Sequence, residues 1–306
     1  MLERFRKPHH AARRRRDRDD DEGVLPFDLE LTRRVTGEYL PARWGTGDPV
    51  EGAQPGPTLG RGGLPALRHQ TADWEGIRRA SFGRGAATAL HAQMQIAGGD
   101  KRVIRVIDDL RTQLLQTLQV EVWNRIAITG PTYGCGATFT AVQLALSISR
   151  IPDCRTMLMD LNQRRPGIAR EMGLRAPGDI RALLGGRARP EDYLLRLSET
   201  LAVGLSDARA ANASEVLHAK RTAEQLDMLI DALCPDVVLY DLPPMLEHDD
   251  LEAFLPQVDG VLIVADAGRT TARQIDECER RLAGKTNLLG VILNRTHAAR
   301  APARAA

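Results

Sequence analysis

A stretch from Arg125 to Phe139 could bind phosphate. It reads Arg-Ile-Ala-Ile-Thr-Gly-Pro-Thr-Tyr-Gly-Cys-Gly-Ala-Thr-Phe, which is an apolar run, a glycine-rich turn and the start of a helical apolar pattern. A strand, a glycine loop and a helix in this order direct backbone N–H groups and the positive end of the helix at a phosphate. The alternative is a turn whose glycines serve packing alone. The candidate nucleotide-binding residues are Gly134, Cys135, Gly136, Ala137, Thr138 and Phe139.

The loop lacks one residue that phosphate loops of this type carry. They have Gly-Lys-Ser/Thr at the start of the helix, and here the sequence is Gly136-Ala137-Thr138. The missing ammonium would make a charge-assisted contact with the β- and γ-phosphates, worth roughly 1.5–3 kcal/mol. Thr138 keeps the hydroxyl that would hold Mg²⁺. We therefore expect weakened binding of ATP or ADP with Mg²⁺, and a larger loss for phosphoryl transfer.

Two carboxylates stand at the ends of other apolar runs. Asp160 could orient a nucleophile or hold a metal-bound water, which makes it the candidate catalytic residue of an active enzyme. Asp241, followed by Leu-Pro-Pro, is presented as a Walker B carboxylate is presented to Mg²⁺. The candidate metal ligands are Thr138, Asp160 and Asp241. Each Asp could instead serve a turn or cap the next segment.

The residues after Asp160 complete the candidate site. Asn162 stands where a second carboxylate could act as a base, and an amide cannot usefully accept a proton. Arg164 and Arg165 could contact phosphate or a neighbouring subunit. A second Gly-Lys-Thr, at 284–286, is rejected as a phosphate loop because it follows a helix and precedes a strand.

The elements that must position these residues alternate between apolar runs and helical patterns. Strands are expected at 125–129, 155–160, 201–205, 236–241, 259–265 and 288–294. Helices are expected at 103–119, 136–150, 179–186, 213–233, 249–255 and 270–283. Runs that are apolar on both faces indicate an α/β fold with a mostly parallel sheet and helices on both faces. The three motifs then share the carboxyl edge of the sheet, where ligands bind in such folds.

The first third of the chain has a different character. Residues 1–100 form a low-order N-terminal region, with a charge block at 1–22, a short amphipathic helix at 23–40 and a Gly/Pro-rich linker at 41–65. Residues 72–96 are expected to be weakly helical. The P-loop domain is placed at 101–296 and a disordered tail at 297–306.

The composition of the chain bears on its partners and on its location in the cell. A net charge of +2 predicts no strong attraction to nucleic acid or anionic membrane. Four Cys without Cys-x-x-Cys spacing fit a reducing, cytoplasmic location. No apolar run approaches the roughly 18–20 residues of a membrane helix, and the N-terminus lacks the apolar core of a signal peptide.

These motifs, in this order, resemble the bacterial tyrosine kinase (BY-kinase) family, P-loop proteins of capsule and exopolysaccharide biosynthesis and export related to the MinD/ParA ATPases. The resemblance spans about 101–296 and includes Leu110-Arg-Thr-Gln-Leu-Leu115, Asp160…Arg164-Arg165-Pro166, Asp241-Leu-Pro-Pro244 and Leu289-Gly-Val-Ile-Leu-Asn-Arg295. It implies an ATP-dependent protein-tyrosine kinase fold. It also implies a membrane chain-length or export protein as partner, with recruitment to the inner face of the membrane, and it leaves a homo-oligomer open.

The chain departs from this family at four places. The family's Pro-Gly-Glu-Gly-Lys-Ser/Thr is here Tyr133-Gly-Cys-Gly-Ala137-Thr138, and its Asp-x-Asp is Asp160-Leu-Asn162. The family's ring-forming Glu-x-x-Arg-x-x-Arg aligns with Arg105, Asp108 and Arg111, so the same ring contacts are not expected. The tail has no tyrosine cluster to phosphorylate.

Three hypotheses follow from this pattern. The favoured one is a degenerate kinase that acts as a regulatory partner of the membrane protein. The alternative is an active kinase or ATPase in which another group, such as Arg165, replaces the missing lysine. A ParA/MinD-like protein that binds DNA or membrane is disfavoured by the near-neutral charge and the lack of a basic or amphipathic tail.

Overall fold

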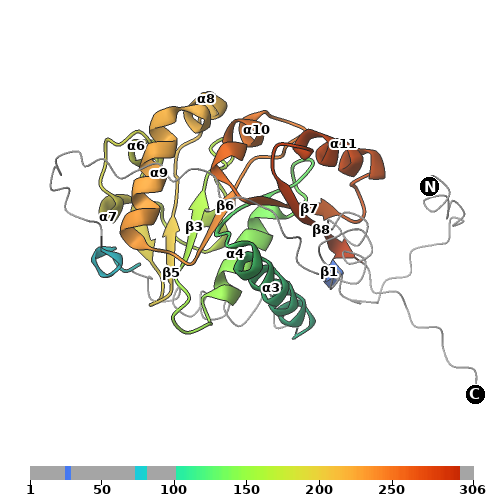
Figure 1. Ribbon diagram of the computed structural model, residues 1–306, viewed down its shortest axis with the longest axis horizontal. Coiled ribbons are helices and arrows are strands. Elements are labelled where there is room, and N and C mark those ends of the chain that lie inside the picture. Colours follow the sequence, from blue (N-terminus) through green and yellow to red (C-terminus); the bar gives the residue numbers. More distant parts are fainter. Residues whose placement is uncertain (1–24, 29–72, 81–100, 297–306) are drawn as a thin grey trace, which may run out of the picture.

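A central eight-stranded sheet organises the structure (Figure 1). The computed structural model describes residues 25–28, 73–80 and 101–296. The strand order is β1-β8-β7-β2-β6-β3-β5-β4, and the six inner strands run parallel. The strands are β1 (Leu25–Asp28), β2 (Arg125–Thr129), β3 (Thr156–Asp160), β4 (Leu194–Arg196), β5 (Leu201–Gly204), β6 (Val237–Asp241), β7 (Gly260–Asp266) and β8 (Asn287–Thr296).

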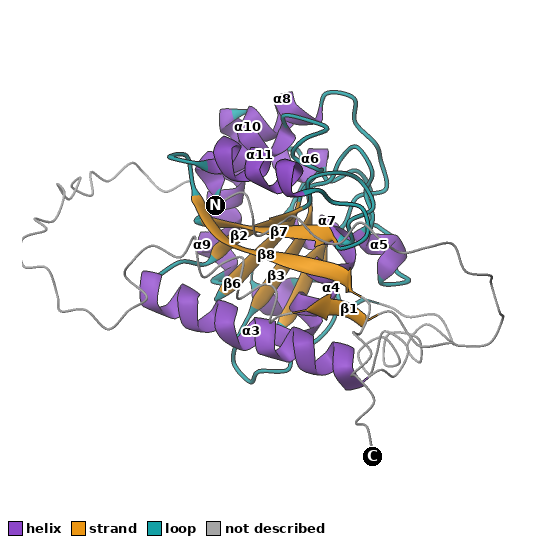
Figure 2. Ribbon diagram, turned by 90° about the vertical axis from the view of Figure 1, so that its right-hand side faces the viewer, coloured by secondary structure: helices purple, strands orange, loops and turns teal. Residues whose placement is uncertain are grey.

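Helices cover both faces of this sheet (Figure 2). The α-helices are α3 (Lys101–Glu121), α4 (Ala137–Ile148), α5 (Ile168–Glu171), α6 (Arg181–Leu184), α7 (Pro190–Tyr193), α8 (Ala213–His218), α9 (Lys220–Leu233), α10 (Asp250–Phe254) and α11 (Ala272–Leu282). Two 3-10 turns, η3 (Trp74–Gly76) and η4 (Leu255–Gln257), complete the described elements. The expected α/β architecture with a mostly parallel sheet is confirmed.

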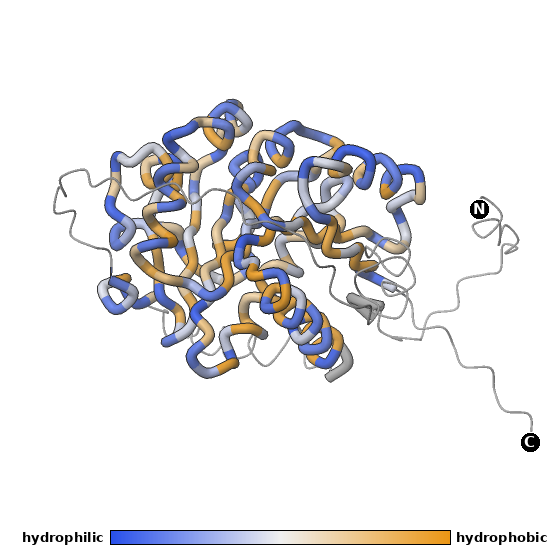
Figure 3. Tube along the Cα trace, in the orientation of Figure 1, coloured by the Kyte–Doolittle hydropathy of each residue, from blue (hydrophilic) through white to orange (hydrophobic). Residues whose placement is uncertain are grey.

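Alternation along the strands divides the core into two layers. Ile126, Ile128 and Leu158 pack with α3 and α4 on one face. Ala127 and Met157 pack on the other face with α9, α10 and α11. Successive side chains of a strand point to opposite faces, so a strand that is apolar throughout must be buried on both. The central strands accordingly form the apolar interior of Figure 3, with polar residues on the outer helices.

The register of the inner strands brings the three motifs together. β2 pairs with β6, and β6 pairs with β3, so the strands that precede all three loops are neighbours. Asp160 lies opposite Asp241 in this register. The carboxyl edge of these strands therefore carries the candidate site.

Several expected elements differ in the structure. Residues 25–28, expected within a helix at 23–40, form strand β1 antiparallel to β8; the rest of that range lies outside the described residues. The helix expected at 213–233 is two helices, α8 and α9, separated by the extended backbone of Ala219. Strand β4 was not expected. The charge block at 1–22, the linker at 41–65 and the tail at 297–306 lie outside the described residues.

Residues 73–80 pack on the domain, although sequence analysis placed them in the low-order region. Trp74 is only 1% exposed, and its indole N–H donates to the Glu199 carbonyl at 2.8 Å. The Arg155 guanidinium lies 5.4 Å from the centre of the indole ring. The backbone of Arg78 to Ala80 pairs with Arg196 at the β4 edge. An isolated aromatic between Gly/Pro-rich stretches gave no pattern from which this contact could be predicted.

Among the helices that the structure describes, none is both long and apolar enough to cross a membrane.

Replacing Trp74 with Ala should destabilise the domain by about 3–5 kcal/mol, because it empties a filled site and leaves the Glu199 carbonyl without its donor. Thermal or urea unfolding of the full chain would measure the change. Val120→Ala, at a residue that is 78% exposed, is the control and should change stability by less than about 0.5 kcal/mol. Equal stability of the Trp74→Ala variant and the wild type would show that residues 73–80 do not belong to the folded unit.

Candidate phosphate-binding and metal site

The loop between β2 and α4 has the backbone shape of an anion cradle. Gly134 and Gly136 adopt left-handed conformations, with φ of 84° and 95°. A Cβ on Gly136 would lie 2.0 Å from Nδ2 of Asn294, so only glycine fits there. Asn294, buried at the end of β8, donates this Nδ2 hydrogen to the Cys135 carbonyl at 2.8 Å. The loop is thus fixed from the β8 side ahead of the N-terminus of α4.

The three candidate metal ligands lie together at the edge of β3 and β6. The Thr138 hydroxyl donates to Oδ2 of Asp241 at 2.7 Å. Oδ2 of Asp160 accepts hydrogen bonds from the backbone N–H groups of Gly167 and Ile168, both at 3.0 Å. Both aspartates are fully buried. Oδ1 of each carboxyl is buried without a hydrogen-bond partner in the part of the chain that the structure describes.

Burial makes ionisation of this pair costly. Removal from water raises the pKa of the Asp160 carboxyl to about 7, while the backbone N–H groups at Ile168 and Gly167 act to lower it. Removal from water, together with the neighbouring charge of Asp160, raises the pKa of Asp241 well above its usual range, against the Thr138 hydrogen bond. Without a cation nearby, the two carboxyl groups favour holding protons.

The second loop is fixed by its own side chains. Oδ1 of Asn162 accepts from the backbone N–H of Arg165 at 3.1 Å. Arg164 binds both carboxylate oxygens of the buried Asp250, at 2.6 and 3.1 Å, and donates to the Ala211 carbonyl at 3.0 Å. The Asp250 hydrogen bond is the main reason that the pKa of Arg164 is raised. Arg164 therefore holds three segments together, and the structure shows it committed to protein contacts.

Arg165 points to the phosphate loop instead. Its guanidinium carbon lies 3.8 Å from the centre of the Tyr133 ring. The Tyr133 hydroxyl is 2.8 Å from Nε2 of His248, and the two rings meet edge to face. Burial raises the pKa of the Tyr133 phenol although Arg165 acts to lower it, so the phenol keeps its proton at neutral pH.

Further arginines approach the loop from β7 and β8. Arg295 donates to the Gly134 carbonyl at 2.7 Å and pairs with Asp266 at 2.5 Å. A Cβ on Gly134 would lie 3.3 Å from Nη1 of Arg269. Arginine side chains therefore lie close to the loop, even though the loop itself has no lysine.

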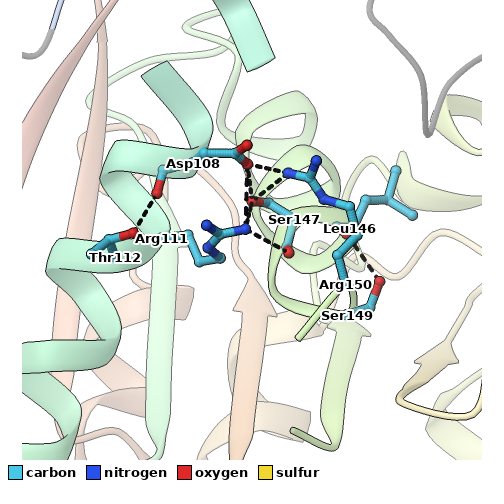
Figure 4. A network of polar contacts seen from close by, with 7 residues as sticks. All are labelled: Asp108, Arg111, Thr112, Leu146, Ser147, Ser149 and Arg150. Carbon is cyan, nitrogen blue, oxygen red and sulfur yellow. Dashed lines mark hydrogen bonds and ion pairs between the residues drawn. The ribbon is translucent and has the colours of Figure 1, made fainter. Parts of the chain in front are cut away.

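Arg111 lies away from this site, in a contact between α3 and α4 (Figure 4). It donates to the carbonyl and hydroxyl of Ser147, at 3.3 and 3.4 Å, and pairs with Asp108 at 3.5 Å. Asp108 also accepts from the Ser147 hydroxyl at 2.6 Å and pairs with Arg150. Two of the three residues that align with the family's ring-forming positions, Asp108 and Arg111, thus bind within their own chain.

The structure brings most of the sequence-predicted residues together. The glycines, Ala137, Thr138, Asp160, Asn162, Arg165 and Asp241 share the carboxyl edge. Cys135 is buried beside the hydroxyls of Thr132 and Thr270, and Phe139 packs partly into the core. The rejected Gly-Lys-Thr lies between α11 and β8, where Lys285 pairs with Glu252 at 3.2 Å.

Sequence analysis missed several contributors to the site. Tyr133, His248 and Arg269 each stand in a loop that follows a strand of the parallel sheet. Their place after strands was the available signal, but neither spacing nor residue type distinguished them from ordinary loop residues. Tyr133, Asn294 and Arg295 were noted only within the comparison with the family pattern, without a role in the site.

The chain is similar in sequence to known proteins of polysaccharide biosynthesis and to tyrosine kinases. No family model matches the chain. It is 32% identical over 149 residues to the succinoglycan biosynthesis transport protein ExoP of Rhizobium meliloti, covering 46% of this chain and 18% of that protein. It is 28% identical over 198 residues to the tyrosine-protein kinase etk of Escherichia coli, covering 62% of this chain and 26% of that one. The chain thus spans about a quarter or less of the length of these relatives.

A shorter relative and a solved structure agree with these matches. The tyrosine-protein kinase YwqD of Bacillus subtilis is 27% identical over 171 residues, covering 55% of this chain and 71% of that protein. The solved kinase domain of the Escherichia coli tyrosine kinase ETK matches 70% of this chain and 83% of its own, with a TM-score of 0.61 and 24% identity. That likeness bears on the fold. In sequence, the chain is similar to proteins named as bacterial tyrosine kinases (BY-kinases), and its fold is that of a solved kinase domain of this kind.

Proposed function

We propose that this chain is a nucleotide-binding BY-kinase-like module of exopolysaccharide or capsule biosynthesis or export, in which phosphoryl transfer is weak or lost. The observation that carries the proposal is the Thr138–Asp241–Asp160 cluster beside a loop that has Ala137 at the lysine position. The cluster supports binding of Mg²⁺ with ATP or ADP. The alanine argues against efficient chemistry, because transferring phosphoryl groups depend on fixed positive charge.

The donor set fits Mg²⁺. Mg²⁺ prefers hard oxygen ligands and keeps several waters, so it needs only one or two carboxylates from a protein. The buried Oδ1 atoms of Asp160 and Asp241 lack hydrogen-bond partners within the described residues, and Thr138 adds a hydroxyl. Thr138, Asp160 and Asp241 would hold the ion, which would supply positive charge against the terminal phosphates. The backbone N–H groups from Gly134 to Phe139 would face the phosphates themselves.

Other residues argue against a complete kinase. Asn162, two residues after Asp160, holds the Arg165 backbone and cannot serve as a base. Tyr240 is fully buried, and Tyr133 is engaged by Arg165 and His248. Among the described residues this leaves Tyr193, which is partly buried and stands at the end of α7 rather than in a tyrosine cluster.

The proposed role is therefore regulatory. We place the module at the cytoplasmic side of a polysaccharide export system, recruited to the membrane by a chain-length or export protein. The support is the similarity to proteins of polysaccharide biosynthesis, one of which is a succinoglycan biosynthesis transport protein. A net charge of +2 gives no reason to expect nucleic acid as a partner.

An active protein-tyrosine kinase or ATPase is the second candidate. The intact Thr138–Asp241 hydrogen bond and the aligned Asp160 favour it, because these are the groups that would hold Mg²⁺ during phosphoryl transfer. Turnover of Mg-ATP that is lost in an Asp160→Ala variant would decide for this candidate and against a degenerate module.

Binding of Mg-ATP to the full chain, measured by calorimetry, should be detectable but weak, and Ala137→Lys should tighten it by about ten- to a hundredfold. The reason is the added charge-assisted contact at the N-terminus of α4. Ala137→Met provides a side chain of similar length without the charge and should leave the affinity near that of the wild type. Absence of both binding heat and thermal shift with Mg-ATP in the wild type and in Ala137→Lys would refute a nucleotide-binding module.

Stability without Mg²⁺ should fall as the pH rises from about 4 to about 7. The folded-state pKa of Asp160, about 7, lies above the ordinary value near 4, so in this range the folded protein holds a proton that the unfolded chain releases. The stabilising effect is complete below pH 4 and is lost as the pH passes 7. Between pH 5 and pH 8 the melting temperature of the wild type should fall further than that of Asp160→Asn, by on the order of 5 °C.

Asp207→Asn, at an exposed aspartate, is the matched control for the pH series and should keep the wild-type slope. Saturating Mg-ATP should also flatten the wild-type curve, because a bound cation favours the ionised carboxylates. Identical slopes for the wild type and Asp160→Asn would contradict a proton-holding pair.

A further inference from the structure

Two of the departures from the family pattern make direct contact with one side chain. Tyr133, in place of the family's proline, stacks under the Arg165 guanidinium at 3.8 Å. Asn162, in place of the second aspartate, accepts the backbone N–H of Arg165 at 3.1 Å. The third departure, Ala137, is the lost cation of the same site.

The platform under Arg165 is itself held in place. The Tyr133 hydroxyl lies 2.8 Å from Nε2 of His248, which fixes the ring from the loop after β6. A guanidinium over the face of an aromatic ring is attracted to it and loses conformational freedom. Arg165 is therefore held over Tyr133, which belongs to the phosphate loop and directly precedes the left-handed Gly134.

Two of the neighbouring cations are already committed to other groups. Arg164 is neutralised by the buried Asp250, and Arg295 pairs with Asp266. Arg165 has no carboxylate within ion-pair distance in the described part of the chain, and its side chain reaches solvent. Its charge remains available to an incoming anion.

We propose that Arg165 supplies the positive charge that the loop lacks at Ala137, with Tyr133 and Asn162 as its positioning residues. Its ligand is the terminal phosphate group of a nucleoside di- or triphosphate seated in the loop. The inference rests on the proposed nucleotide binding and names the group that makes such binding work without the lysine. Planar guanidinium groups bind phosphate oxygens in pairs, which suits this replacement.

A double-mutant cycle in the full chain tests the replacement. Dissociation constants for Mg-ATP and AMP are measured for the wild type, Arg165→Gln, Ala137→Lys and the double variant. Arg165→Gln should weaken Mg-ATP binding about ten- to a hundredfold in the wild-type background, and only a few-fold in the Ala137→Lys background. AMP, which lacks the terminal phosphates, should respond little in either background.

Two controls separate charge from structure. Arg170→Gln removes an exposed arginine of the neighbouring α5 helix and should leave all constants unchanged. Tyr133→Leu removes the platform but leaves the charge, and should give an intermediate loss of Mg-ATP affinity. Melting temperatures of all variants report whether each is folded.

The outcomes distinguish this inference from the proposed function. Equal losses from Arg165→Gln in both backgrounds would mean that Arg165 only supports the loop, and tighter binding after Arg165→Gln would mean that the stack covers the site; either result overturns the proposal. No Mg-ATP binding by the wild type, with binding by Ala137→Lys, would also overturn it, because Arg165 would then not replace the lysine. Failure of every variant to bind would refute nucleotide binding itself.

Discussion

Two carboxyl groups without exposed surface lie opposite each other at the ends of β3 and β6, and the carboxyl edge of the sheet is built around them. Asp160 draws two backbone N–H groups into place and so sets the start of α5. Asp241 holds the Thr138 hydroxyl and so sets the first turn of α4. Burial of adjacent like charges is unfavourable unless protons or a cation offset it. A site of this kind is stable either when its carboxyl groups hold protons or when a cation is bound to them.

Sequence reasoning predicted what local pattern dictates. Apolar runs such as 236–241 and the glycine loop before Thr138 predicted the inner strands, the main helices between them and the shared edge. It failed where a distant contact decides the outcome. Residues 25–28 have an apolar spacing that a helix could use, yet they pair with β8, and the buried Trp74 binds Glu199, 125 residues along the chain. The Tyr133–His248 hydrogen bond likewise joins loops 115 residues apart, which no local periodicity reports.

The departures from the family pattern are not scattered losses. Tyr133 and Asn162 both contact Arg165, so they form one cluster beside the position of the absent lysine. Asp108 and Arg111, which align with positions implicated in ring assembly, bind Ser147 and pair with each other on the α3–α4 surface of the same chain. In both places polar groups that could face a ligand or a neighbour have partners inside the molecule.

Backbone from the N-terminal part of the chain pairs with the sheet on both of its sides. β1 lies along the end of β8, and the backbone of residues 78–80 bonds to β4. Unpaired strand margins attract strands from other molecules, which is a common route to aggregation. A fragment that begins at α3 would leave both margins bare, with their N–H and C=O groups open to pairing. Residues 25–28 and 78–80 therefore cover part of the backbone of the strands next to them, β8 and β4.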